Sequence, residues 1–130
     1  MYEKSTNGIR ISVRPEYLPD QSEPEKGYFV WAYHIAIRNE GRRTVTLLTR
    51  HWRIVDARGR VQEVRGAGVV GEQPTLRPGE SFEYTSGTPL PTAGGFMGGS
   101  YQMQTDDGEV FEVEIPTFSL DVPDATGPLH

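Results

Sequence analysis

Residues 28–38 read YFVWAYHIAIR, and this segment gives the clearest indication of how the chain folds. Successive side chains of a β-strand point to opposite faces, so the large apolar residues share one face: Phe29, Trp31, Tyr33, Ile35 and Ile37. The other face is also mostly apolar but carries smaller side chains. A strand with two apolar faces is typical of the middle of a sheet. We therefore predict a central strand, ended by a turn at residues 39–42.

The segments on either side show the same alternation. It predicts strands at residues 8–14, 44–55, 61–64, 81–86, 101–105 and 109–115, with an edge strand at 118–120. Asp-Ala-Arg-Gly at 56–59 and Asp-Asp-Gly at 106–108 predict two hairpin turns. The apolar phase slips within 44–55, which indicates a β-bulge at 49–51, and the prolines of 15–26 favour an irregular loop. We expect one all-β domain over residues 1–130, ordered from about 8 to 122, folded as an immunoglobulin-like β-sandwich of about seven to eight antiparallel strands.

Composition excludes several classes of protein. The chain has no cysteine, which rules out disulfides, thiolate metal sites and thiol nucleophiles. No apolar run approaches the roughly 20 residues that cross a bilayer, and the first residues lack the apolar core of a secretion signal, so we expect a cytoplasmic protein with no membrane contact. The net charge of −5 argues against nucleic-acid binding. Residues 38–65, however, hold eight arginines and three acidic residues, either within a mixed charged surface or as a basic patch for an anionic partner.

Motifs along most of the chain resemble the ApaG family. The resemblance is strongest at residues 63–74 (EVRGAGVVGEQP), 76–80 (LRPGE) and 84–87 (YTSG), and it extends over about residues 9–122. It implies a fibronectin type III-like or immunoglobulin-like sandwich. It also implies a bacterial protein associated with cobalt and magnesium tolerance or efflux. Similar domains in F-box proteins and in a polymerase-delta-interacting protein imply partner binding, and the family brings no catalytic residues.

Residues 66–71 read GAGVVG, which matches the GxGxxG pattern of phosphate-binding loops. In dinucleotide-binding folds these glycines open a helix whose amides approach a pyrophosphate. Pro74 and Pro78 prevent such a helix here. Two interpretations remain: a structural turn, or an anion or pyrophosphate site formed by Arg65, Gly66, Gly68 and Gly71.

A second glycine-rich stretch, GGFMGG at residues 94–99, surrounds two apolar side chains. It is either a flexible loop that presents Phe96 and Met97 to a partner, or a wide connection between the sheets with Met97 in the core.

The sequence shows no assembled catalytic or metal site. Its three histidines, His34, His51 and His130, have no metal-ligand spacing, and the acidic turn at residues 106–109 is an acidic hairpin more readily than a magnesium site. We therefore predict a non-enzymatic binding module without a cofactor, with a protein partner, linked indirectly to cobalt and magnesium tolerance. The alternative is a phosphate or nucleotide sensor that uses the GxGxxG loop. The module is expected to be a monomer or a homodimer.

Overall fold

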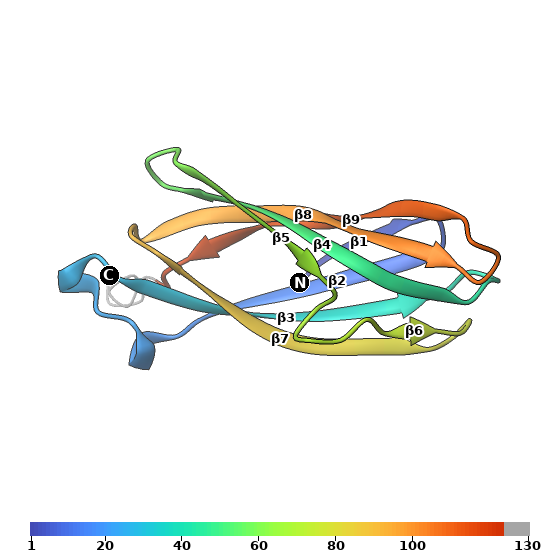
Figure 1. Ribbon diagram of the computed structural model, residues 1–130. Helices are drawn as coiled ribbons and strands as arrows, with labels where there is room; N and C mark the ends of the chain where they lie inside the picture. The colour runs from blue at the N-terminus through green and yellow to red at the C-terminus, as the bar shows by residue number, and fades with distance from the viewer. Residues whose placement is uncertain (124–130) are drawn as a thin grey trace.

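The computed structural model describes residues 1–123 as two antiparallel sheets packed face to face (Figure 1). The first sheet has the order β1-β2-β3-β7, formed by β1 (Tyr2–Thr6), β2 (Ile9–Tyr17), β3 (Phe29–Asn39) and β7 (Ser81–Leu90). The second has the order β5-β4-β8-β9, formed by β4 (Val45–Asp56), β5 (Val61–Ala67), β8 (Gly94–Thr105) and β9 (Val110–Asp121), with the short β6 (Thr75–Leu76) also paired to β4. These two layers confirm the predicted all-β sandwich.

The central strand β3 has the predicted position and orientation. It pairs with β2 on one side and β7 on the other. Its large side chains point into the sandwich, where Trp31 is 1% and Ile37 0% exposed. The smaller Val30 and Ala32 alternate with them on the other face and are also buried, at 9% and 8% exposure. Apolar character on both faces of the segment therefore marks a strand that is flanked by two neighbours and is covered on its smaller face as well.

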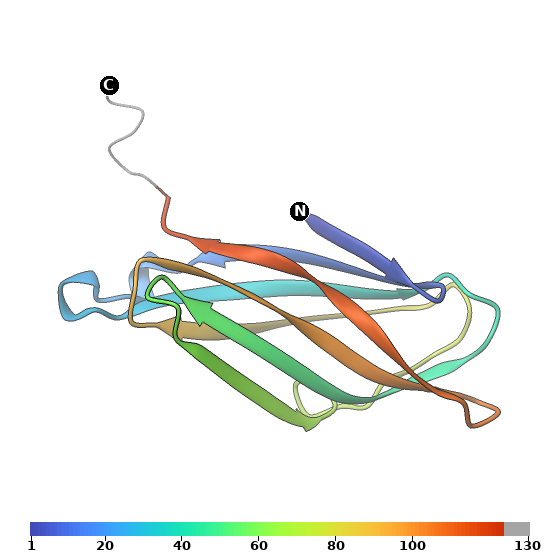
Figure 2. The same cartoon turned by 90° about the horizontal axis from the view of Figure 1, so that it is seen from above.

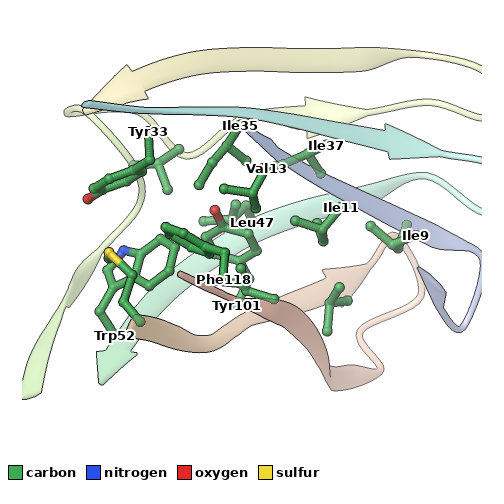
Figure 3. Packing of buried hydrophobic residues seen from close by; sticks show 14 of the residues in the cluster. Ile9, Ile11, Val13, Tyr33, Ile35, Ile37, Leu47, Trp52, Tyr101 and Phe118 are labelled. Atoms are coloured by element: carbon green, nitrogen blue, oxygen red, sulfur yellow. The ribbon is translucent and has the colours of Figure 1, made fainter. Parts of the chain in front are cut away.

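The core is a continuous layer of aliphatic and aromatic side chains between the sheets (Figure 3). Phe118 of β9 packs edge-on against Trp52 of β4, with ring centroids 6.1 Å apart. Tyr33 of β3 lies 5.2 Å from the Trp52 ring and 6.1 Å from the Phe118 ring. This aromatic cluster joins the two sheets, because Tyr33 belongs to one and the other two rings belong to the opposite one.

The two sheets approach each other closely where β1 and β9 lie side by side (Figure 2). Lys4 of β1 forms an ion pair of 2.8 Å with Glu114 of β9, and the Tyr2 hydroxyl accepts a hydrogen bond from the Ser119 amide. The predicted ordered core began at residue 8, so β1 was not anticipated. Its sequence, YEKST, has too few apolar residues to show alternation, and it is held in place by these cross-sheet contacts.

The proline-rich segment is more regular than predicted. Strand β2 continues through Pro15 to Tyr17. Strand β1 begins with Tyr2 opposite Val13, so this side of β2 is unpaired beyond Val13, where proline is tolerated. Two short 3-10 helices follow, η1 (Pro19–Gln21) and η2 (Pro24–Lys26), each with proline at its start. Within residues 1–123, neither these helices nor any other has the length and apolar character to cross a membrane.

The predicted bulge is present in β4, one residue earlier than expected. The pairing of β4 with β8 shifts between Leu47 and Thr49, which leaves Leu48 as the extra residue. Leu47 is buried before the bulge, and Trp52 and Ile54 are buried after it. The change of phase places Arg50 on the same inner face as Trp52, between the two sheets.

Candidate functional site

The stretch at residues 66–71 forms the end of strand β5 and a tight turn, with no helix. Val69 and Glu72 exchange two backbone hydrogen bonds of 2.8 and 2.9 Å around the turn. The two central residues, Val70 and Gly71, have φ angles of +43° and +82°. Two consecutive left-handed residues are the pattern of a type I′ turn. The helix that a dinucleotide site requires is therefore absent from this stretch.

The glycines of the motif have structural reasons to be glycine. A Cβ on Gly66 would lie 2.8 Å from Nη1 of Arg50, so this glycine leaves room for the guanidinium group. Gly68 has a φ of +64°, and its Cβ would lie 2.2 Å from the Glu72 carbonyl oxygen. Gly71 supplies the second left-handed residue of the turn, in open space. These requirements arise within the protein and involve no ligand.

The backbone amides of the turn are largely used inside the protein. The Gly68 amide donates to the Leu48 carbonyl at 2.9 Å, and the Val69 amide donates to Glu72 at 2.8 Å. These two N–H groups do not point at a ligand, as an anion-binding nest of amides would need.

The four residues of the predicted anion site are divided among three places. Arg65 lies on the outer face of β5, where its guanidinium is 3.8 Å from a Glu63 oxygen, whereas Gly66 faces inward beneath Arg50. Gly68 and Gly71 lie in the turn. The structure therefore separates the predicted cation from the glycines that were to act with it.

Arg50 is the cation that the structure places beside the turn. Its Nη1 donates to the carbonyls of Ala67 and Gly68, at 3.1 and 2.9 Å. Within residues 1–123, no carboxylate lies close enough to form an ion pair with it. Arg50 was not among the residues predicted for the site. The signal was available, because continuing the alternation of Trp52 and Ile54 back by two residues places Arg50 on the inner face.

A pocket of about 180 Å³ opens beside Arg50. It lies between β3, β4, β7 and the turn, and its lining residues are Tyr33, Arg50, Trp52, Val69, Val70, Gly71, Tyr84 and Ser86. The Tyr84 hydroxyl shares a hydrogen bond of 2.5 Å with the hydroxyl of Tyr101, which is fully buried. The polar groups of this pocket are thus one guanidinium and a set of hydroxyls.

The phenols around this pocket remain protonated at neutral pH. Burial raises the pKa of Tyr84 and of Tyr101 well above that of a free tyrosine. Burial also raises the pKa of Tyr33, although its hydrogen bond with Ser86 and the charge of Arg50 offset part of this rise. The pocket consequently carries the positive charge of Arg50 with no phenolate to balance it.

The glycine-rich residues 94–99 form part of strand β8, with a bulge at Gly98, and not a flexible loop. Met97 is 0% exposed in the core and cannot face a partner, whereas Phe96 is 44% exposed on the outer face. A Cβ on Gly98 would lie 2.7 Å from the Thr117 hydroxyl, and one on Gly99 would lie 1.9 Å from the His51 carbonyl oxygen. These glycines therefore allow neighbouring strands to approach β8 closely.

Phe96 belongs to an apolar row on the outer face of the β5-β4-β8-β9 sheet. The register places Val55 directly opposite both Val61 of β5 and Phe96 of β8. Val61 is 48% exposed, and Val55, in the middle, is buried by its two neighbours. We call Val61, Val55 and Phe96 the apolar row. Phe96 also lines a groove of about 210 Å³, together with Gly98 and Gly99.

Beyond the apolar row, the same face carries both signs of charge. His51 and Arg53 of β4 lie opposite Arg65 and Glu63 of β5, and the His51 ring is bonded to Glu63 at 2.8 Å. Glu114 of β9 lies on the other side. On this face, the arginines of residues 38–65 thus form part of a mixed charged surface.

His34 and His51, the two histidines among the described residues, both bond to protein side chains. His34 bridges three strands, because its Nε2 is 2.8 Å from a Glu16 oxygen and its Nδ1 is 2.8 Å from the Thr85 hydroxyl. His130 lies outside the described residues. In the acidic turn, Asp107 and Glu109 both pair with Arg43. Across residues 1–123, no three histidine, aspartate or glutamate side chains come together as metal ligands.

Comparison with known proteins assigns the family. The sequence model of the ApaG domain matches residues 19–105. The chain is 69% identical over 123 residues to Protein ApaG of Rhodospirillum centenum, with 95% of each chain covered, and 61% identical over 130 residues to Protein ApaG of Parvibaculum lavamentivorans, with both chains covered completely. It is also similar to the crystal structure described as that of an ApaA protein from Bordetella pertussis, with 50% identity, a TM-score of 0.88, and coverage of 90% of this chain and 95% of that one. Similar in sequence and in fold along nearly its whole length, the chain belongs to the ApaG family.

Proposed function

We propose that this protein is a cytoplasmic, non-enzymatic binding module that docks another protein on the outer face of its β5-β4-β8-β9 sheet. The observation that carries the proposal is the apolar row, in which two large side chains, Val61 and Phe96, are about half exposed on either side of Val55. An aromatic anchor surrounded by polar groups is the usual centre of a protein interface. The mixed charges beyond the row provide the polar surroundings.

One arrangement of catalytic residue types within residues 1–123 supports binding better than catalysis. Thr85, His34 and Glu16 form a chain of hydroxyl, imidazole and carboxylate across the outer face of the first sheet. Acyl transfer also needs free N–H donors directed at the developing oxyanion. Strands β2, β3 and β7 pair side by side around these residues, and the amides of paired strands are directed along the sheet to their neighbours. We interpret His34 as a structural link between three strands.

The implied connection with cobalt and magnesium is proposed to act through the docked partner. The described residues offer no cluster of metal ligands, and the apolar row is unsuited to a hydrated cation. A partner that itself handles divalent cations would connect this module with tolerance to them.

The test is a comparison of matched surface variants. Phe96→Ser and Val61→Ser are expected to weaken binding of a partner recovered with the wild-type protein at least tenfold, because truncating an interface anchor costs about 2 kcal/mol or more. Val110→Ser is the control, since Val110 is 47% exposed on the same sheet but distant from the row in the register. Binding constants are measured by calorimetry with the purified partner.

Two outcomes would contradict the proposal. One is a partner whose affinity is unchanged by Phe96→Ser or is reduced equally by Val110→Ser. The other is a dimer of this protein in ultracentrifugation that Phe96→Ser dissociates, which would make a second copy the occupant of the row.

A further inference from the structure

We propose that the pocket beside Arg50 binds a small oxyanion of the phosphate class. This site is separate from the docking face, because Arg50 points between the sheets while the apolar row lies on the outer surface. It also differs from the anion site expected from the GxGxxG pattern, which relied on backbone amides and on Arg65.

The first argument is the charge of Arg50. A guanidinium group has five N–H donors, and Nη1 makes both of its bonds to the Ala67 and Gly68 carbonyls. The remaining donors have no acceptor among the side chains of residues 1–123, and no carboxylate is within ion-pair distance. A partly buried cation is stabilised by an opposite charge, and the planar guanidinium matches the oxygens of a phosphate.

The second argument is the character of the other polar groups. The hydroxyls of Tyr33, Tyr84 and Ser86 line the pocket, and the burial described above keeps the phenols protonated. When Tyr101 donates to Tyr84, the Tyr84 proton is free to donate to an anion, as is one proton of the bonded pair Tyr33 and Ser86. These hydroxyls would offer a cation neither negative charge nor a full set of oxygen ligands. The pocket therefore favours a negative ligand.

The third argument is size. The pocket holds about 180 Å³, less than the roughly 300–1,000 Å³ typical of sites for drug-sized ligands. A phosphate group fits within such a volume, whereas a whole nucleotide does not. Val70, which is 52% exposed, lies at the edge of the pocket on the turn. The turn therefore forms one wall of the site, and the glycine motif shapes the pocket without supplying its donors.

The test is a titration with inorganic phosphate at constant ionic strength, followed by calorimetry and by the NMR signals of the Arg50 side chain and the Val70 and Gly71 amides. Wild type is expected to show saturable one-site binding. Arg50→Gln is expected to weaken it at least tenfold, as is the double variant Tyr84→Phe with Ser86→Ala, which keeps the guanidinium and its two carbonyl contacts. Arg65→Gln, which removes a cation from the outer face, is expected to bind like wild type.

Further ligands distinguish free phosphate from a phosphate group that is part of a larger molecule. Pyrophosphate and ATP are titrated in the same way, and binding of ATP with loss of affinity in Arg50→Gln would identify a terminal phosphate as the occupant. The proposal is overturned if wild type shows no saturable binding of any of the three ligands, or if Arg65→Gln loses affinity while Arg50→Gln keeps it. If Arg50→Gln does not fold, the double variant Tyr84→Phe with Ser86→Ala decides the question. Phosphate binding that is unchanged in this folded variant also overturns the proposal.

Discussion

Gly68→Ala is expected to lower the free energy of unfolding by about 3 kcal/mol or more, whereas Gly71→Ala should lower it by only about 1–2 kcal/mol. Both glycines have left-handed φ angles, +64° and +82°, so both variants carry the conformational cost of alanine in that region. They differ in their surroundings. A Cβ at position 68 would lie 2.2 Å from the Glu72 carbonyl oxygen, while the space around position 71 is open.

The two variants thus form a matched pair that separates steric overlap from backbone strain. Urea unfolding of both, with equal slopes to confirm comparable denatured states, gives the difference directly. Equal destabilisation by the two substitutions would show that the close approach of Gly68 to Glu72 does not constrain the fold.

Phe118→Ala is expected to destabilise the protein by about 3–5 kcal/mol. Phe118 is 1% exposed and packs against Trp52 and Tyr33, so its removal leaves a cavity at the junction of the two sheets. Because small domains are stable by only about 5–15 kcal/mol, this variant should be close to the limit of folding at physiological temperature.

Phe96→Ala on the adjacent strand is the control for this prediction. Its side chain is 44% exposed, and we expect a change within about 1 kcal/mol. The measurement is chemical denaturation of both variants under identical conditions. A loss of similar size at the two positions would contradict the assignment of Phe118 to the core and Phe96 to the surface.

Local sequence patterns predicted those parts of the fold that depend on neighbouring residues. The alternation in residues 28–38 identified the central strand. The turns Asp-Ala-Arg-Gly at 56–59 and Asp-Asp-Gly at 106–108 identified the β4–β5 and β8–β9 hairpins. The prolines at positions 74 and 78 correctly predicted that no helix follows the glycine motif. These predictions succeed because strand alternation and turn chemistry are properties of a few consecutive residues.

Features that depend on distant contacts were harder to predict. Strand β1 is fixed by β2 and by cross-sheet bonds to β9, and the glycines of β8 are required by the approach of His51 and Thr117. Although β2 follows β1 directly, β9 lies more than 100 residues from β1, and His51 and Thr117 are also distant in sequence from the glycines that they approach. Arg50 was missed because the bulge predicted at residues 49–51 included it, whereas the actual bulge lies before it, at Leu48.

We infer that the glycine motif leaves room for the Arg50 side chain. A double-mutant cycle between positions 50 and 66 tests this most directly. Gly66→Ala would displace the guanidinium from the Ala67 and Gly68 carbonyls, so in wild type it should cost about 1.5–3 kcal/mol of unfolding free energy, the value of hydrogen bonds to a charged group. In an Arg50→Ala background the space is vacant, and the same substitution should change stability by less than about 0.5 kcal/mol. An equal cost of Gly66→Ala in both backgrounds would show that Gly66 does not accommodate Arg50.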